Sequence, residues 1–164
     1  MYQVVTKAIE KSISEFTCDG FDGLDPRKAY VFVSNHRDIV LDTSLLNVAL
    51  YDNHLSMTAS AMGDNLLRKK YLKILAMLNR NIIIYRSLPP REALEHSKLV
   101  SEYIYHCITE EHRNVWIAQR EGRTKNGDDR TQQGVLKMLT LNAPEETSPL
   151  QYLKTLNLVP MSIS

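Results

Sequence analysis

Apolar and polar residues in the first third of the chain alternate between the spacing of helices and that of buried strands. Residues 2–15 place apolar side chains three or four positions apart, which predicts an amphipathic helix. A turn rich in Gly and Asp over residues 19–27 leads into residues 29–34, a β-branched and aromatic run typical of a buried strand. Residues 42–51 return to the helical spacing, so we expect a second helix there.

The next stretch is expected to hold a short strand and a basic amphipathic helix. Residues 54–59 favour a strand, and the polar cluster of Gly63, Asp64 and Asn65 marks a helix start. One stripe of that helix is apolar, formed by Leu67, Tyr71, Ile74 and Leu78. Cations lie away from the stripe, at Arg68, Lys69, Lys70 and Lys73. These cations form either a solvated helix face or a surface for an anionic partner.

Strands and helices continue to alternate in the middle of the chain. Residues 81–85 are predicted to form a strand by their isoleucines, and the strand ends at Arg86, Ser87 and two prolines. Residues 91–109 resume the helical period, and residues 115–118 again favour a strand. Each of these strands thus ends just before a charged segment.

A polar loop over residues 121–130 separates the last predicted elements from the rest. A helix is expected at 131–141, with Asp128 or Asp129 as its cap, followed by a further helix and a strand. The alternation predicts one layered α/β domain over residues 1–164 with several parallel strands. Functional residues in such domains gather in the loops at strand ends.

Composition and charge narrow the classes of function. A chain of 164 residues with 43% hydrophobic residues can bury a core without disulfides or metal. Its net charge of +1 gives no reason to expect nucleic acid as a partner. Cys18 and Cys107 are far apart, which fits two buried thiols in a reducing, cytoplasmic compartment. No apolar run suits a signal peptide or a membrane span, so membrane contact is expected to be peripheral.

The turn after the first predicted strand carries an imidazole and carboxylates. His36 is a natural general base for a hydroxyl, and a neighbouring carboxylate from Asp38 or Asp42 would fix its tautomer. A metal site would need a second histidine at ordinary spacing, which the sequence lacks. His36-Arg37-Asp38 also matches a protein-kinase signature, but Thr43 stands where that loop requires asparagine. A purely structural histidine remains the alternative.

The polar loop after residues 115–118 is strongly cationic. Arg123 and Lys125 suit an anionic ligand such as phosphate, and Gly122 would let the backbone approach it closely. A solvated charged loop is the alternative. Arg86 and the apolar residues 159–163 also stand at predicted strand ends, which connects all four segments to one region of the fold.

These four segments resemble, in order, the motif blocks of the glycerolipid acyltransferases, which include glycerol-3-phosphate and lysophosphatidate acyltransferases. Asn35, His36 and Asp42 resemble the first block, and the strand that ends in Arg86 resembles the second. Glu121, Gly122 and Arg123 resemble the third, and residues 159–163 the fourth. The interval from His36 to Asp42 is one residue longer than usual in the family, which keeps Asp38 open as the partner of His36.

The resemblance implies an α/β/α acyltransferase-type domain with a mixed, largely parallel sheet, cut short at its C-terminus relative to full-length family proteins. It implies that His36, oriented by Asp42, deprotonates the hydroxyl of glycerol 3-phosphate or lysophosphatidate for phospholipid synthesis. The acyl donor would be acyl-CoA or acyl carrier protein, without a cofactor or metal. Arg86, Glu121, Gly122, Arg123 and Lys125 would bind the acceptor phosphate, and Arg37 is one candidate for an oxyanion donor.

Two further classes of function remain open. A non-catalytic lipid-binding module could use the basic helix face around Lys69 and Lys73 at a membrane surface. A thioesterase or lipid hydrolase would instead use an activated water. In the acyltransferase interpretation we expect a peripheral enzyme at the cytoplasmic face of the inner membrane.

Overall fold

The computed structural model describes residues 15–124 and 127–164, and its centre is a five-stranded sheet. The strands are β1 (Val31–Ser34), β2 (Ala59–Gly63), β3 (Ile82–Ile84), β4 (Val115–Ala118) and β5 (Leu158–Met161). Their order in the sheet is β3-β2-β4-β1-β5, and every pairing between them is parallel. This confirms the expected layered α/β fold with a largely parallel sheet. The helix expected at residues 2–15 lies outside the described residues except for its last position.

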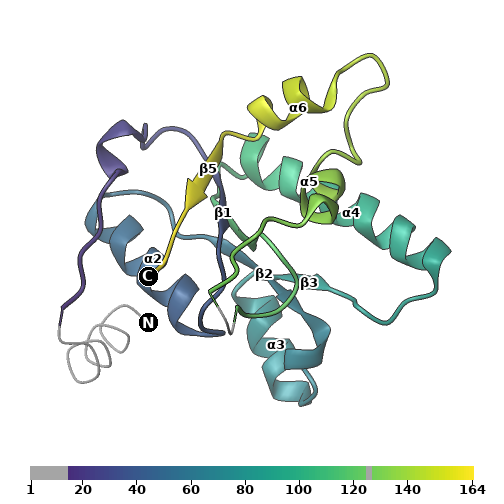
Figure 1. The fold of residues 1–164 in the computed structure, drawn as a ribbon, viewed down its shortest axis with the longest axis horizontal. Helices are drawn as coiled ribbons and strands as arrows, with labels where there is room; N and C mark the ends of the chain where they lie inside the picture. Colours follow the sequence, from purple (N-terminus) through teal and green to yellow (C-terminus); the bar gives the residue numbers. More distant parts are fainter. Residues whose placement is uncertain (1–14, 125–126) are drawn as a thin grey trace.

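Helices cover both faces of the sheet, as parallel strands require. The helices are α2 (Leu41–Asp52), α3 (Lys70–Leu78), α4 (Pro90–Thr109), α5 (Gln133–Leu139) and α6 (Pro149–Thr155), with short 3-10 turns at Phe21–Gly23 and Asp64–Leu66. The strand order reverses after β3, so right-handed crossovers place α2 and α3 on one face and α4, α5 and α6 on the other. Figure 1 shows α4, α5 and α6 together at the upper right of the sheet.

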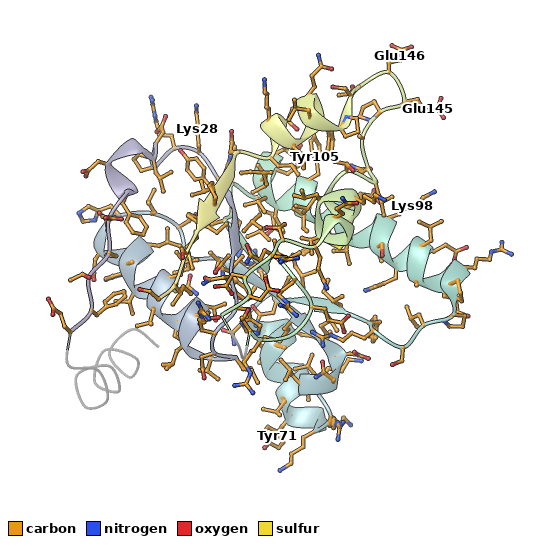
Figure 2. The ribbon with its side chains drawn as sticks, in the orientation of Figure 1. Lys28, Tyr71, Lys98, Tyr105, Glu145 and Glu146 are labelled. Carbon is orange, nitrogen blue, oxygen red and sulfur yellow. The ribbon has the colours of Figure 1, made fainter. Side chains whose placement is uncertain are left out.

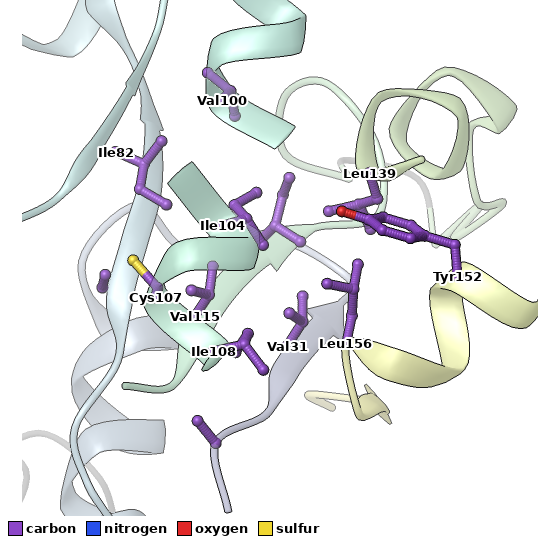
Figure 3. Close-up of a cluster of buried hydrophobic side chains, with 13 residues drawn as sticks. Val31, Ile82, Val100, Ile104, Cys107, Ile108, Val115, Leu139, Tyr152 and Leu156 are labelled. Atoms are coloured by element: carbon purple, nitrogen blue, oxygen red, sulfur yellow. The ribbon is translucent and has the colours of Figure 1, made fainter. Parts of the chain in front are cut away.

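Two apolar cores follow from the alternation of side chains along the strands. Val31 of β1 packs into the core beneath α4, α5 and α6, whereas the next residue, Phe32, packs into the core beneath α2. Figure 3 shows the first core, to which Ile104 of α4 and Leu139 of α5 both belong. Both side chains are fully buried, and each contributes about 1.5–3 kcal/mol to stability by leaving water.

Some predicted elements are displaced in the structure. The strand expected at 54–59 is β2, which begins at Ala59 and runs through Gly63, because parallel pairing with β4 and β3 fixes its position. The helix start expected at Gly63 is only a short 3-10 turn before α3. Neither Asp128 nor Asp129 caps α5, whose N-cap residue is Gln132.

The apolar stripe of α3 faces solvent. Tyr71, Ile74 and Leu78 of this stripe are all exposed, and Ala76 on the opposite side of the helix is buried. Figure 2 shows Tyr71 pointing away from the body of the molecule. An amphipathic helix normally turns its apolar stripe to the core, so α3 has the reverse orientation.

Two further expectations concerned the burial of the cysteines and the absence of a membrane span. Cys107 is buried, as expected, but Cys18 is exposed, which corrects the interpretation of both as buried thiols. Burial raises the pKa of the Cys107 thiol. Among the described residues, no helix combines the length and the apolar character that crossing a membrane requires.

Candidate active site

The candidate residues gather where the parallel strands end. Asn35 and His36 follow β1, Arg86 follows β3 and Glu121 follows β4, so all of them lie at the carboxyl edge of the sheet. The loop after β4 is joined to the turn after β1 by two backbone hydrogen bonds. Gln119 N donates to Ser34 O over 2.7 Å, and Thr124 N donates to His36 O over 2.8 Å. These backbone hydrogen bonds hold the segments of the first and third sequence blocks side by side.

His36 is held between a carboxylate and an indole ring. Its Nδ1 lies 2.7 Å from Oδ2 of Asp42, and its ring meets the edge of Trp116 with 5.6 Å between centroids. The His36 side chain is 14% exposed, while the Asp42 side chain is 2% exposed. When the carboxylate accepts a hydrogen bond from Nδ1–H, the neutral ring has its lone pair on Nε2. No described residue donates a hydrogen bond to that lone pair. A neutral ring in this tautomer can act as a general base through Nε2.

Asp42 also fixes the backbone of the turn that carries His36. Its Oδ2 accepts a hydrogen bond from the amide of Arg37 over 2.9 Å, and its Oδ1 accepts one from the amide of Asp38 over 3.0 Å. Asp42 lies in the first turn of α2, so the helix positions the carboxylate. The longer interval between His36 and Asp42 is accommodated because the turn wraps around this buried side chain.

Asp38, the alternative partner of His36, bonds the backbone at the start of α2 instead. Its Oδ1 accepts hydrogen bonds from the amides of Val40 and Leu41, both over 2.9 Å, at the start of α2. These bonds from Leu41 and Val40 lower the pKa of the Asp38 carboxyl, and the charge of Arg123 lowers it further. Asp38 therefore holds the helix start, and Asp42 alone of the two carboxylates bonds the ring.

Asn35 joins the fourth block to the first. Its Oδ1 accepts a hydrogen bond from Ile163 N, and its Nδ2 donates to Ile163 O, each over 2.8 Å. The side chain is almost completely buried. The segment after β5 is thus fixed directly beside His36 by a reciprocal pair of hydrogen bonds, although sequence reasoning gave Asn35 no role of its own.

Asp129 is a site residue that the sequence analysis missed. Its Oδ2 accepts a hydrogen bond from Arg37 Nη2 over 2.7 Å and a longer one from Asn35 Nδ2 over 3.3 Å. The pKa of the Asp129 carboxyl is lowered by the Thr124 hydroxyl and then by Asn35 and Arg37. Thr124 Oγ1 and Asp129 Oδ1 form no well-aligned hydrogen bond, so the Thr124 hydroxyl acts on this carboxyl as a nearby dipole. Arg37 is thus joined to Asp129 through Nη2 and to Ile163 O through Nε.

Arg86 and Glu121 meet across the edge of the sheet. Nη1 of Arg86 lies 3.3 Å from Oε1 of Glu121, and the backbone N–H of Arg86 donates to Asp64 Oδ1. The Arg86 side chain is 34% exposed, so this ion pair is accessible to solvent. Gly63 lies against the guanidinium, where a Cβ would approach Arg86 Nε to 2.6 Å. The second and third blocks are therefore in contact.

The remaining third-block residues face solvent. Gly122 has a φ of 74°, a left-handed backbone that favours glycine, and no protein atom lies within 4 Å of the place a Cβ would take. Arg123 is exposed and close enough to Asp38 to affect its pKa. Lys125 lies outside the described residues.

A family model described as Acyltransferase matches residues 15–164. The chain belongs to this acyltransferase family. The match confirms the resemblance to glycerolipid acyltransferases that the four blocks indicated, and it covers all of them. No curated protein matches the chain.

The acyltransferase domain has a cavity on the α2 side of the sheet. Its volume is about 760 Å³, within the range of small-molecule sites, and Asp42 contributes to its wall. Aromatic and aliphatic side chains supply much of the lining, namely Phe16, Phe21, Leu24, Phe32, Leu45 and Met161. In residues 15–124 and 127–164, no cluster of three or more His, Cys, Asp or Glu side chains is arranged to hold a metal ion.

Proposed function

We propose that this acyltransferase moves a fatty acyl group from acyl-CoA or acyl carrier protein to a hydroxyl of glycerol 3-phosphate or lysophosphatidate. The observation that carries the proposal is the Nδ1 contact between His36 and Asp42, which leaves Nε2 as the base. This pair lies at the sheet edge that also carries Arg86 and Arg123. A base beside cations suits an acceptor that has both a hydroxyl and a phosphate.

In the proposed reaction, His36 Nε2 takes the proton of the acceptor hydroxyl as the oxygen attacks the thioester carbonyl carbon. Asp42 holds the ring by Nδ1 and stabilises the imidazolium that forms. The tetrahedral intermediate then collapses, the carbon–sulfur bond breaks, and the imidazolium returns the proton to the leaving thiolate. No covalent acyl-enzyme is needed, because bringing both substrates together already makes the attack effectively intramolecular.

The cations at the edge are proposed to bind the acceptor phosphate. Arg86 presents a guanidinium that Glu121 contacts from one side, so its other N–H groups remain for phosphate oxygens. Arg123 is exposed and is proposed to bind the same phosphate, together with Lys125. Glu121 would orient Arg86, and the left-handed turn at Gly122 would direct the loop toward the ligand.

The cavity beside Asp42 is proposed to bind the acyl chain. Its aromatic and aliphatic lining would remove methylene groups from water, each worth about 0.8 kcal/mol. One wall belongs to Asp42, so a chain bound there would end close to the base. The product would be an acylated glycerol phosphate, the class of compound from which phospholipids are built.

One assay tests the proposed function. Purified protein is given a radiolabelled acyl-CoA or acyl carrier protein thioester, with glycerol 3-phosphate or lysophosphatidate offered separately, and the labelled products are resolved. Acceptor-dependent formation of an acylated product supports transfer. Release of free fatty acid without acceptor would instead identify a hydrolase, and no turnover with any of the four combinations would contradict an enzymatic role for this chain.

A further inference from the structure

Helix α3 presents a solvent-facing apolar surface that the acyl-transfer chemistry does not use. Four of its side chains are exposed by about half or more, namely Tyr71 (56%), Ile74 (48%), Met77 (61%) and Leu78 (74%). They recur at three- and four-residue steps, so they form one stripe along the helix. Isolated exposed apolar residues are common, but a continuous stripe indicates an interaction surface. We call these four residues the α3 stripe.

Positive charge surrounds the α3 stripe. The sequence from Asn65 to Leu78 contains four Lys and Arg residues and no Asp or Glu, although the whole chain has a net charge of only +1. Lys70 and Lys73 are exposed on α3 itself. Nζ of Lys69 lies 5.9 Å from the ring centroid of Tyr71. Basic charge is therefore concentrated on this part of an otherwise slightly acidic chain.

The combination of stripe and lysines fits a lipid surface better than a protein surface. Helices that lie in the lipid–water interface bury an apolar face and keep Lys and Arg at the headgroups. Protein interfaces, by contrast, are depleted of Lys. Two copies joined through this face by a two-fold axis would also bring their own lysines together, which costs free energy.

The position of α3 connects this surface to the site. Helix α3 follows the carboxyl end of β2, so its first turn lies at the edge of the sheet that carries His36. Ile39, Val40 and Leu41, directly after the catalytic turn, are exposed at the same edge by 42%, 64% and 38%. The Lys70 end of α3 therefore lies at the edge of the sheet that carries the candidate site.

We propose that α3 docks this protein on an anionic lipid bilayer, with the α3 stripe among the acyl chains and Lys69, Lys70 and Lys73 at the headgroups. The docking does not depend on the proposed acyl transfer. It brings the edge that carries His36, which adjoins the Lys70 end of α3, close to the membrane surface, where a lipid substrate would be delivered.

Vesicle flotation tests the docking. The whole protein is mixed with vesicles of phosphatidylcholine and phosphatidylglycerol in equal parts, and with pure phosphatidylcholine vesicles. We expect binding to the anionic vesicles that weakens as salt is raised. The double variants I74S/L78S and K70E/K73E should each weaken it by about tenfold or more. Leu150→Ser and Lys154→Glu, exposed on α6, are the matched controls and should bind like the wild type.

A fluorescent label locates the contact. In a Cys18→Ser background, where the remaining Cys107 is buried, Met77→Cys and Leu150→Cys each give one exposed thiol in residues 15–124 and 127–164. An environment-sensitive dye at position 77 should shift to the blue with anionic vesicles, and the dye at position 150 should not. Equal shifts at both positions would overturn the assignment to α3.

The remaining outcomes separate docking from acyl transfer. Binding that survives both α3 variants, or no binding by the wild type, overturns the proposal. A wild-type dimer that I74S/L78S converts to a monomer without change in vesicle binding would assign the stripe to a second copy and also overturn it. Transfer to soluble glycerol 3-phosphate in the absence of vesicles should be the same in I74S/L78S and the wild type, so failure of docking and failure of acyl transfer are distinguishable.

Discussion

Gly63 packs directly against Arg86, and no larger residue fits there without moving the guanidinium. A Cβ at position 63 would lie 2.6 Å from Nε of Arg86 and would also collide with the side chain of Asn65. Both obstacles are flexible side chains, and the backbone of Gly63 has an ordinary φ of −71°. A substitution here therefore changes the position of Arg86 more than it changes the fold.

We expect Gly63→Ala to raise the KM for the phosphate-bearing acceptor by about tenfold, with a stability loss of about 1–3 kcal/mol from overpacking. The displaced Arg86 would lose its alignment with the phosphate, whereas the His36–Asp42 pair is not touched. Steady-state kinetics with varied acceptor and urea unfolding measure the two effects. Gly134→Ala in α5, where a Cβ meets nothing, is the control and should leave KM unchanged. An unchanged KM in Gly63→Ala would argue against phosphate binding at Arg86.

Replacing His36 by glutamine should lower the rate of acyl transfer by about 10²–10⁴-fold, because no other described group offers a base at this position. The fold should remain, since the ring is partly exposed and glutamine has similar length. Product formation and circular dichroism measure the two properties. His112→Asn is the control, because His112 is exposed and has a left-handed φ that asparagine tolerates. Unfolding of His36→Gln would point to a structural histidine instead.

Asp42→Asn should reduce both activity and stability. The carboxylate accepts hydrogen bonds from His36 and from two backbone amides, and the NH₂ group of asparagine cannot accept the bonds on its side. One unsatisfied buried donor costs about 1–3 kcal/mol. Transfer assays and urea unfolding on the same preparation give both effects. A fully stable and fully active variant would show that the carboxylate neither orients His36 nor holds the turn.

Asp38→Ala should give a stability loss that depends on pH. The loss of its two hydrogen bonds at the start of α2 costs about 1 kcal/mol at neutral pH. The folded-state pKa of Asp38 is lowered from its ordinary value of 3.8, so the charged form stabilises the fold above pH 3.8. That contribution is lost as the pH falls through the lower folded-state pKa. Unfolding free energies of wild type and variant should therefore converge in acid.

Asp38→Asn distinguishes the charge from the hydrogen bonds. Its amide oxygen can still accept from the backbone at the helix start, so most of the stability should remain, without the dependence on pH. A difference between wild type and Asp38→Ala that is constant from neutral to acid pH would contradict the role given to the Asp38 carboxylate.

Most strands could be predicted from sequence because their signal is local. The isoleucines of β3 and the apolar run of β1 have side chains that favour strands in any context. β2, with the sequence ASAMG, has no such signal and is a strand because β3 and β4 pair with it on both sides. The orientation of α3 was also hidden, because an amphipathic pattern does not say which face meets the sheet.

The site was predictable where its residues are close in sequence. His36 and Asp42 are on one turn, and only the choice between Asp42 and Asp38 needed the structure. Asp129 was not predictable as a partner of Arg37, since 92 positions separate the two residues. A loop carboxylate carries no local signal for such a contact, which depends on the whole fold.

The parallel sheet also has a consequence for the order in which this protein folds. The two neighbours of β1 in the sheet, β4 and β5, both come from the later part of the sequence. Asn35 is likewise 128 positions from Ile163, to which it is hydrogen-bonded. Contacts of such high sequence separation form slowly, because a long loop must close before any of them is made. Catalytic competence should therefore appear in the last phase of refolding, well after the helices have recovered their circular dichroism.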